Sequence, residues 1–129
     1  MLLTIQSQRH EEMASKIGNL EVLPIREAFA HEAHNFTTWL EKNIDTLSSR
    51  IGLPLIVEKR EVPIGKFRAD LVCRDNQGNS VVIENQLEQT DHDHLGKLIT
   101  YMGNLKANTA IWITPQPRLE HQIAVEHFN

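Results

Sequence analysis

The chain has 129 residues, 40% of them hydrophobic and 23% charged, which predicts one soluble globular domain over residues 1–129 with a core of its own. Its formal net charge of −4 excludes a protein that coats nucleic acid by bulk electrostatics, although an acidic site and a separate basic rim can coexist in one enzyme. The single cysteine excludes an internal disulfide, the first residues turn polar too soon for a signal peptide, and no apolar run has membrane-spanning length, so we expect a cytoplasmic protein.

The N-terminal quarter of the chain is weakly patterned. Residues 1–19 are polar with little periodicity, which predicts a short helix or a loosely packed arm. The apolar run 20–25 is interrupted by Pro24, which predicts an edge strand or a connector. Residues 26–33 predict a helix.

A better defined helix is predicted over 36–51, where apolar residues recur at spacings of three and four. Thr38, with Glu41 three residues later, fits a capping box, and Gly52 followed by Pro54 closes the helix. The sequence therefore predicts one continuous helix that ends at Gly52.

The remainder of the chain alternates short apolar strands with helices. Turn-forming residues and apolar alternation predict a three-stranded meander, a helix capped by Thr90 and Asp93, a fourth strand and a final helix. These elements are expected at 55–62, 67–73, 80–86, 91–105, 109–114 and 118–128. The predicted fold class is α/β, with a small mixed sheet of about four strands flanked by helices.

Two carboxylates lie at the ends of adjacent predicted strands, inside segments that otherwise have the composition of a core. Asp70 shares a strand face with Arg68, and Glu84 shares a face of the next strand with Gln86. Like charges brought this close require a cation or a proton. The side chain of Asn85 points to the other face, but its backbone carbonyl can turn toward the acids. This all-oxygen ligand set favours Mg²⁺ or Mn²⁺ over zinc, and it suits phosphodiester hydrolysis.

At these residues the chain resembles the PD-(D/E)XK nuclease-like superfamily, which has the restriction-endonuclease-like fold. Asp70 matches the first acidic position of that superfamily, and Glu84-Asn85-Gln86 matches its (D/E)-X-K tripeptide. More narrowly, residues 17–128 are similar to bacterial nuclease-like domains of mostly unassigned function. The matching segments are Arg26-Glu27, Glu32 to Leu40, Gly65 to Asp70, Glu84 to Gly96 and Thr100-Tyr101.

The resemblance implies a restriction-endonuclease-like core and a metal-dependent nuclease. It assigns Asp70 and Glu84 as direct metal ligands, beside the backbone carbonyl of Asn85 that strand alternation makes a candidate. It places Glu32 on the first core helix, where an acidic residue supports the metal or its water.

The residue at position 86 departs from the superfamily, which usually has lysine there. Glutamine can form a hydrogen bond to the attacking water but supplies no positive charge. Some members move the lysine onto the following helix, and Lys97 is a candidate for such a migrated charge. His94 and Tyr101 lie three and four residues from Lys97, on the same helical face, and are candidates to contact substrate. Tyr101 could equally belong to the core.

The segment Asp91-His92-Asp93-His94 contains types of residue that bind zinc or nickel. On a helix, however, His92 and His94 point about 200° apart. A capped, acidic helix start with one histidine aimed at the site is the preferred interpretation.

Two functions from different classes follow. The preferred one is Mg²⁺-dependent hydrolysis of DNA in restriction, repair or defence against mobile DNA, with Arg68 or Lys97 offsetting charge. The alternative is a catalytically inactive module of the same fold that binds nucleic acid or a partner protein, which the missing lysine and the acidic balance both support. In either case the chain could act as a homodimer or within a longer protein or system. The candidate basic rim is scattered along the sequence, at Lys59, Arg60, Lys66, Arg68, Lys97 and Lys106.

Overall fold

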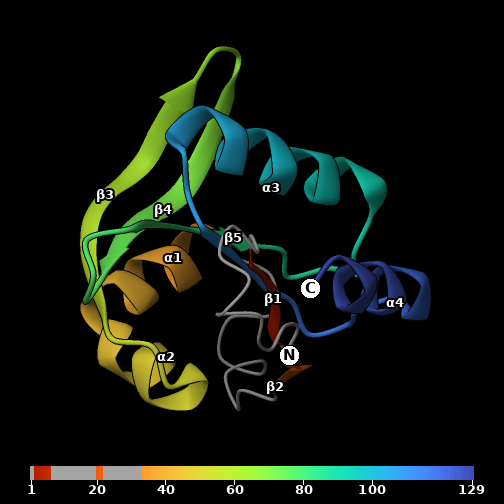
Figure 1. Ribbon diagram of the computed structural model, residues 1–129, viewed down its shortest axis with the longest axis horizontal. Coiled ribbons are helices and arrows are strands. Elements are labelled where there is room, and N and C mark those ends of the chain that lie inside the picture. Colours follow the sequence, from red (N-terminus) through yellow and green to blue (C-terminus); the bar gives the residue numbers. More distant parts are fainter. Residues whose placement is uncertain (1, 7–19, 22–32) are drawn as a thin grey trace.

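The computed structural model describes residues 2–6, 20–21 and 33–129 (Figure 1). Its elements, in chain order, are β1 (Leu2–Gln6), β2 (Leu20–Glu21), α1 (Ala33–Lys42), α2 (Ile44–Ile51), β3 (Leu55–Ile64), β4 (Phe67–Asp75), β5 (Ser80–Asn85), α3 (His92–Leu105), β6 (Thr109–Ile113) and α4 (Leu119–Phe128). The strands form one sheet in the order β2-β1-β6-β5-β4-β3. The sheet is mixed, because β5 and β6 run parallel while the other neighbouring strands run antiparallel.

Helices cover both faces of this sheet. The alternation of β6 shows this directly: Ile111 and Ile113 pack in the core beneath α1 and α2, whereas Trp112 packs in the core beneath α3 and α4. The fold is therefore a three-layer α/β arrangement, and the predicted fold class is confirmed. All four predicted strands are present, and β1 and β2 extend the sheet beyond them.

Cys73 lies in the core on the α1/α2 side of the sheet. Burial raises the pKa of its thiol to about 12, so the thiolate needed for nucleophilic chemistry is not populated near neutral pH. The residue serves packing, as its position on an apolar strand face indicates.

The N-terminal segment differs from the prediction for residues 1–19. Residues 2–6 form strand β1, which pairs antiparallel with β6 through Leu2↔Ile113 to Gln6↔Thr109. This pairing satisfies backbone groups along an edge of β6 that would otherwise be open. The predicted edge strand near residue 20 is confirmed for β2, whereas the helix predicted over 26–33 lies outside the described residues except for its last position.

The predicted helix over 36–51 is broken at Asn43. The Asn43 side-chain amide donates a hydrogen bond to the carbonyl of Trp39 (2.8 Å), a local bond that competes with helical continuation. The predicted capping box at Thr38 is wrong, because α1 begins at Ala33 and Thr38 lies within it. Gly52 ends α2 in the left-handed region (φ 67°), as predicted.

The N-terminus of α3 also differs from the predicted cap. Asp91 is the capping residue, and its Oδ1 accepts a hydrogen bond from the backbone N–H of His94 (2.8 Å). Thr90 is buried and contacts the start of α4 instead. Among the described residues, no helix combines the length and the apolar character needed to cross a membrane.

Candidate active site

The two predicted acids converge where β4 and β5 separate. The paired region of these strands ends at Leu71↔Ile83, so Asp70 and Glu84 occupy the next position outward on each strand. The backbone N–H of Asp70 donates to Glu84 Oε2 (3.3 Å), and the N–H of Asn85 donates to Asp70 Oδ2 (2.8 Å). Each carboxylate therefore accepts a hydrogen bond from a backbone N–H just beyond the end of the β4–β5 pairing. These two bonds hold the acids side by side.

Burial makes this pair electrostatically unfavourable. The Glu84 side chain is only 4% exposed, and burial followed by repulsion from Asp70 raises the pKa of Glu84 to about 8. Burial also raises the pKa of Asp70, although the N–H of Asn85 and the positive charges of His94 and Lys97 act to lower it. Near neutral pH the pair consequently holds a proton that neither acid would hold in water.

Lys97 and His94 lie on the face of α3 that covers the acids. The charge of Lys97 lowers the pKa of both Asp70 and Glu84, and the charge of His94 lowers that of Asp70. The Lys97 ammonium also contacts the exposed Asp93 carboxylate, with 3.4 Å between Nζ and Oδ2. The predicted approach of α3 to the acid pair is thus present in the structure.

Asp91 fixes the orientation of His94. Its Oδ1 accepts from the backbone N–H of His94 and lies 2.8 Å from His94 Nδ1. Although burial opposes the effect, these two bonds hold the pKa of Asp91 below its ordinary value. The ionised carboxylate therefore favours the tautomer with the proton on Nδ1, which leaves Nε2 of His94 for other partners.

Gln86 is committed to a buried network. Its Nε2 donates to the carbonyl of Gln89 (2.8 Å) and to Asp91 Oδ2 (3.0 Å), while its Oε1 accepts from Trp112 Nε1 (3.1 Å). Both amide hydrogens are used and the side chain is 3% exposed. Gln86 thus ties the end of β5 to β6 and to the start of α3, and orienting a water would require breaking this network.

Tyr101 belongs to the core rather than to the wall of a cleft. Its side chain is 1% exposed and packs with Val72 and Val82, and its hydroxyl donates to the carbonyl of Arg68 (3.0 Å). Burial, and then the Glu84 carboxylate, raise the pKa of Tyr101 to about 12. Tyr101 is therefore too deeply buried to contact a substrate directly.

The remaining predicted site residues are Asn85, Arg68 and Glu32. The Asn85 amide points to the opposite face, as expected, and its Nδ2 donates to Thr37 Oγ1 on α1 (2.7 Å). Arg68 is exposed, and its guanidinium forms no ion pair with any described residue. Glu32 lies outside the described residues.

Comparisons with known proteins support a nuclease fold. No family model matches the sequence, and no curated protein matches it either. Among solved structures, a repair endonuclease from Pyrococcus abyssi superposes with a TM-score of 0.59 at 16% identity, over 75% of this chain and 43% of that one. The chain has a nuclease-like α/β fold. It spans less than half the length of the endonuclease chain, and the likeness at this identity concerns the fold alone.

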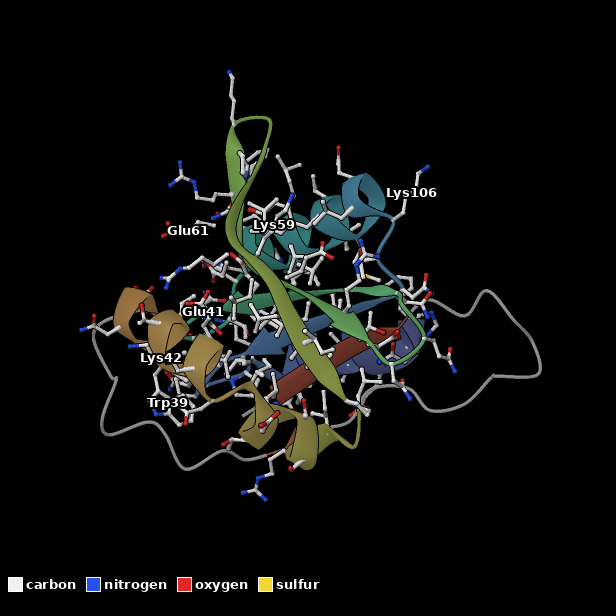
Figure 2. The ribbon with its side chains drawn as sticks, turned by 90° about the vertical axis from the view of Figure 1, so that its left-hand side faces the viewer. Trp39, Glu41, Lys42, Lys59, Glu61 and Lys106 are labelled. Atoms are coloured by element: carbon white, nitrogen blue, oxygen red, sulfur yellow. The ribbon has the colours of Figure 1, made fainter. Side chains whose placement is uncertain are left out.

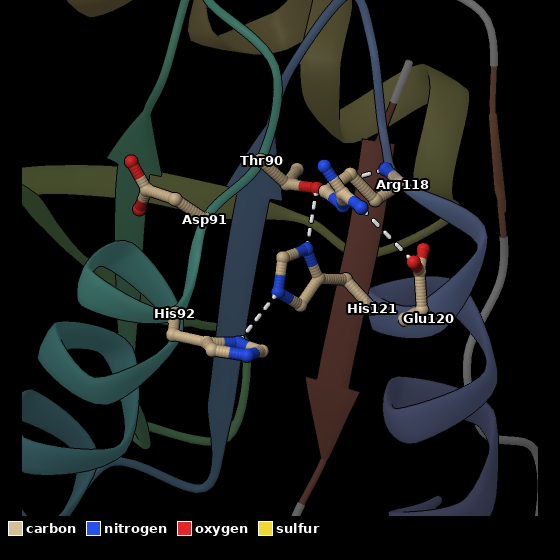
Figure 3. Close-up of a pocket in the computed structure, with 6 residues that line it drawn as sticks. All are labelled: Thr90, Asp91, His92, Arg118, Glu120 and His121. Carbon is tan, nitrogen blue, oxygen red and sulfur yellow. Dashed lines mark hydrogen bonds and ion pairs between the residues drawn. The ribbon is translucent and has the colours of Figure 1, made fainter.

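A histidine pair near the N-terminus of α3 was not predicted from the sequence. His121 is 2% exposed, with Nδ1 2.6 Å from Thr90 Oγ1 and Nε2 3.0 Å from His92 Nδ1. Both histidines line an open pocket of about 280 Å³, shown in Figure 3, where Asp91 points away from them. Because His92 and His121 are 29 residues apart, no local spacing signals their contact.

Residues 91–94 form the capped start of α3, where the sequence left open a metal site or a helix cap. His92 contacts His121, whereas His94 contacts Asp91, so the two histidines face different neighbours as their angular separation predicts. Within the part of the chain that the structure describes, no three His, Cys, Asp or Glu side chains gather as a metal site. The capped helix start is the arrangement observed.

Proposed function

We propose that this chain is a Mg²⁺- or Mn²⁺-dependent endonuclease that hydrolyses phosphodiester bonds of DNA, in restriction, repair or defence against mobile DNA. The observation that carries the proposal is the convergence of Asp70 and Glu84 across the ends of β4 and β5. The nuclease-like fold agrees with it.

The donor set fits a hard divalent cation. Asp70 and Glu84 repel each other in a buried setting, and a cation between them would remove the repulsion that raises their pKa values. These two carboxylates, with the backbone carbonyl of Asn85, would hold it. When bound, Mg²⁺ lowers the pKa of water and neutralises charge on a phosphodiester.

The chain's own side chains supply the remaining functions. Lys97, whose charge already acts on both acids, would offset the negative charge that develops on the phosphate and so replace the lysine absent from position 86. His94, oriented by Asp91, would present Nε2 to the substrate. Gln86 would hold the end of β5 and the start of α3 in place, so that these groups keep their positions. Glu32 would assist the water, as the resemblance implies.

Cleavage and metal binding test the proposal together. Wild-type protein with Mg²⁺ or Mn²⁺ should nick supercoiled plasmid, and both Asp70→Asn and Glu84→Gln should abolish nicking. Calorimetric titration with Mn²⁺ should show binding to the wild type that is lost in Asp70→Ala. Circular dichroism would confirm that the variants are folded. A wild-type protein that cuts neither duplex nor single-stranded DNA at millimolar metal would refute the nuclease.

The alternative is a catalytically inactive module of the same fold that binds nucleic acid or a partner protein. The observation that favours it is the commitment of both Gln86 amide hydrogens to the protein itself, at the position where the superfamily usually has lysine. DNA binding that is independent of metal and leads to no cleavage would establish this alternative.

The small size of the chain bears on its assembly. It covers 43% of the matching endonuclease chain, so much of that protein has no counterpart here. We propose that the domain acts as a homodimer or as part of a longer chain or multi-component system. Light scattering during size-exclusion chromatography, with and without DNA, would determine the oligomeric state.

A further inference from the structure

The hairpin of β3 and β4 extends beyond the rest of the sheet. β4 pairs with β5 only from Leu71 to Arg74, whereas β3 and β4 remain paired out to Ile64↔Phe67. The turn is closed by Gly65, whose φ of 61° lies in the left-handed region. Figures 1 and 2 show the paired strands projecting past α3. We call the part beyond β5, residues 61–68, the hairpin ribbon.

Four cations lie on this ribbon and at its base. The ribbon carries Lys66 and Arg68 against the single acid Glu61, a formal charge of +1 in a chain whose formal charge is −4. Lys59 and Arg60 lie at its base, where β3 pairs with the part of β4 that β5 also pairs with. Arg60 binds Glu41 on α1 (3.3 Å). Lys59, Lys66 and Arg68 are exposed and form no ion pair with a described residue. Positions that looked scattered along the sequence are therefore gathered by the hairpin.

An exposed aromatic side chain also lies at the tip of the ribbon. Phe67 is 50% exposed, at the first position of β4. Because side chains alternate along a strand, it points to the opposite face from Arg68. A DNA backbone that lies along the Arg68 face therefore meets the cations and not this ring.

The ribbon begins at the acid pair. Arg68 precedes Asp70 by two residues on β4, or about 7 Å at strand spacing, and Lys66 lies beyond Arg68 in the turn at the tip. The distance from Asp70 to Arg68 corresponds to the rise of about two base pairs. A DNA strand whose phosphate lies at Asp70 could therefore follow the ribbon to its tip.

We infer that the hairpin ribbon binds the backbone of duplex DNA flanking the cleaved phosphate, through Lys66 and Arg68. A two-stranded ribbon of this kind fits the major groove of B-DNA. The inference rests on the proposed nuclease function for the identity of the substrate, but it concerns binding and not the chemical step.

Binding of a fluorescein-labelled duplex of about 24 base pairs, followed by anisotropy without divalent metal, tests the inference. The double variant Lys66→Ala/Arg68→Ala should lose at least tenfold in affinity at about 100 mM KCl. Its slope of log K against log salt should fall by about 1.8, because two phosphate contacts are removed. Phe67→Ala, which removes a side chain from the other face of the strand, should change affinity by less than threefold with the slope unchanged. A single strand of the same sequence should bind more weakly than the duplex.

The control removes the same charge from another part of the surface. Lys42 and Arg50 are exposed on α1 and α2, away from the ribbon, and Lys42→Ala/Arg50→Ala should change affinity by less than threefold. Equal losses of affinity and slope in the two double variants would overturn the inference, as would a wild type without measurable affinity for duplex. Plasmid nicking separates the two proposals: ribbon-dependent binding without cleavage refutes only the nuclease, and cleavage with ribbon-independent binding refutes only the ribbon.

Discussion

Replacing Glu84 by glutamine removes the charge from the buried acid pair while keeping the shape of the side chain. Glu84 has a pKa of about 8 in the folded protein, against an ordinary value of 4.5. The folded state therefore binds this proton more tightly than the unfolded state does. By linkage, stability is fully present below pH 4.5, falls as pH rises toward 8, and stays low above that.

The size of the effect follows from the same shift. Each pH unit between the two pKa values is worth about 1.4 kcal/mol, so the raised pKa of Glu84 makes the free energy of unfolding at most about 3 kcal/mol smaller at pH 7 than in acid, because the unfolded chain ionises this carboxyl while the folded one keeps it protonated. Because Asp70 shares the proton and the site can relax, we expect about 1–2 kcal/mol in practice. In a domain of this size that corresponds to a rise in Tm of about 4–8 °C for Glu84→Gln.

Thermal unfolding followed by circular dichroism in EDTA provides the assay. The gain of Glu84→Gln over wild type should be present at pH 8 and absent at pH 5, where the wild-type carboxyl is protonated. Glu88→Gln, an exposed position four residues along, is the matched control and should change Tm by little at either pH. Addition of about 10 mM Mg²⁺ should raise the Tm of the wild type at pH 8 but not that of Glu84→Gln.

Two results would refute this reasoning. If Glu84→Gln is no more stable than wild type at pH 8, the carboxylate is not held in an unfavourable setting. If the gain is the same at pH 5 and pH 8, the effect comes from packing and not from charge.

Three further substitutions test the groups around the acid pair. Lys97→Ala should lower the nicking rate by about 10²-fold and Lys97→Arg by less, since arginine keeps the charge; unchanged nicking by Lys97→Ala would exclude the migrated lysine. His94→Asn should lower the nicking rate, whereas His92→Ala, at a histidine that faces the other way, should leave the rate unchanged; equal rates for wild type and His94→Asn would remove His94 from the reaction. Gln86→Leu should destabilise the fold by about 2–3 kcal/mol in urea unfolding because it leaves the Trp112 N–H without its acceptor, and a loss below about 0.5 kcal/mol would show that this network is not needed.

The parts of the site that local patterns predict are those set by strand alternation. Asp70 and Glu84 interrupt apolar strands at positions whose parity faces α3, and the turn between the strands contains residues that favour a short connection. Gly78 adopts a φ of 82° in this turn. These signals depend on neighbours within a few residues, so convergence of the acids could be predicted without knowledge of the whole fold.

The features that were missed depend on distant partners or on competition within a single turn. Pairing of β1 with β6 joins residues more than a hundred positions apart. The break at Asn43 depends on whether one amide bonds the backbone of Trp39, which periodicity does not report. The role of Gln86 is set by Trp112, 26 residues later, and its amide could be assigned to water only while that partner was unknown.

The contact with Trp112 also makes lysine unfavourable at position 86. The indole N–H is buried beside Gln86 Oε1 and requires an acceptor, which glutamine has and lysine lacks. A lysine here would leave that donor unsatisfied, at a cost of about 1–3 kcal/mol. In the proposed nuclease the positive charge would then come from another element, and Lys97 on α3 already acts on both acids. Gln86→Lys alone should therefore destabilise the chain, while Gln86→Lys with Trp112→Phe, which removes the unsatisfied donor, should recover part of the loss. Failure of Trp112→Phe to relieve Gln86→Lys would mean that something other than the indole excludes lysine from this position.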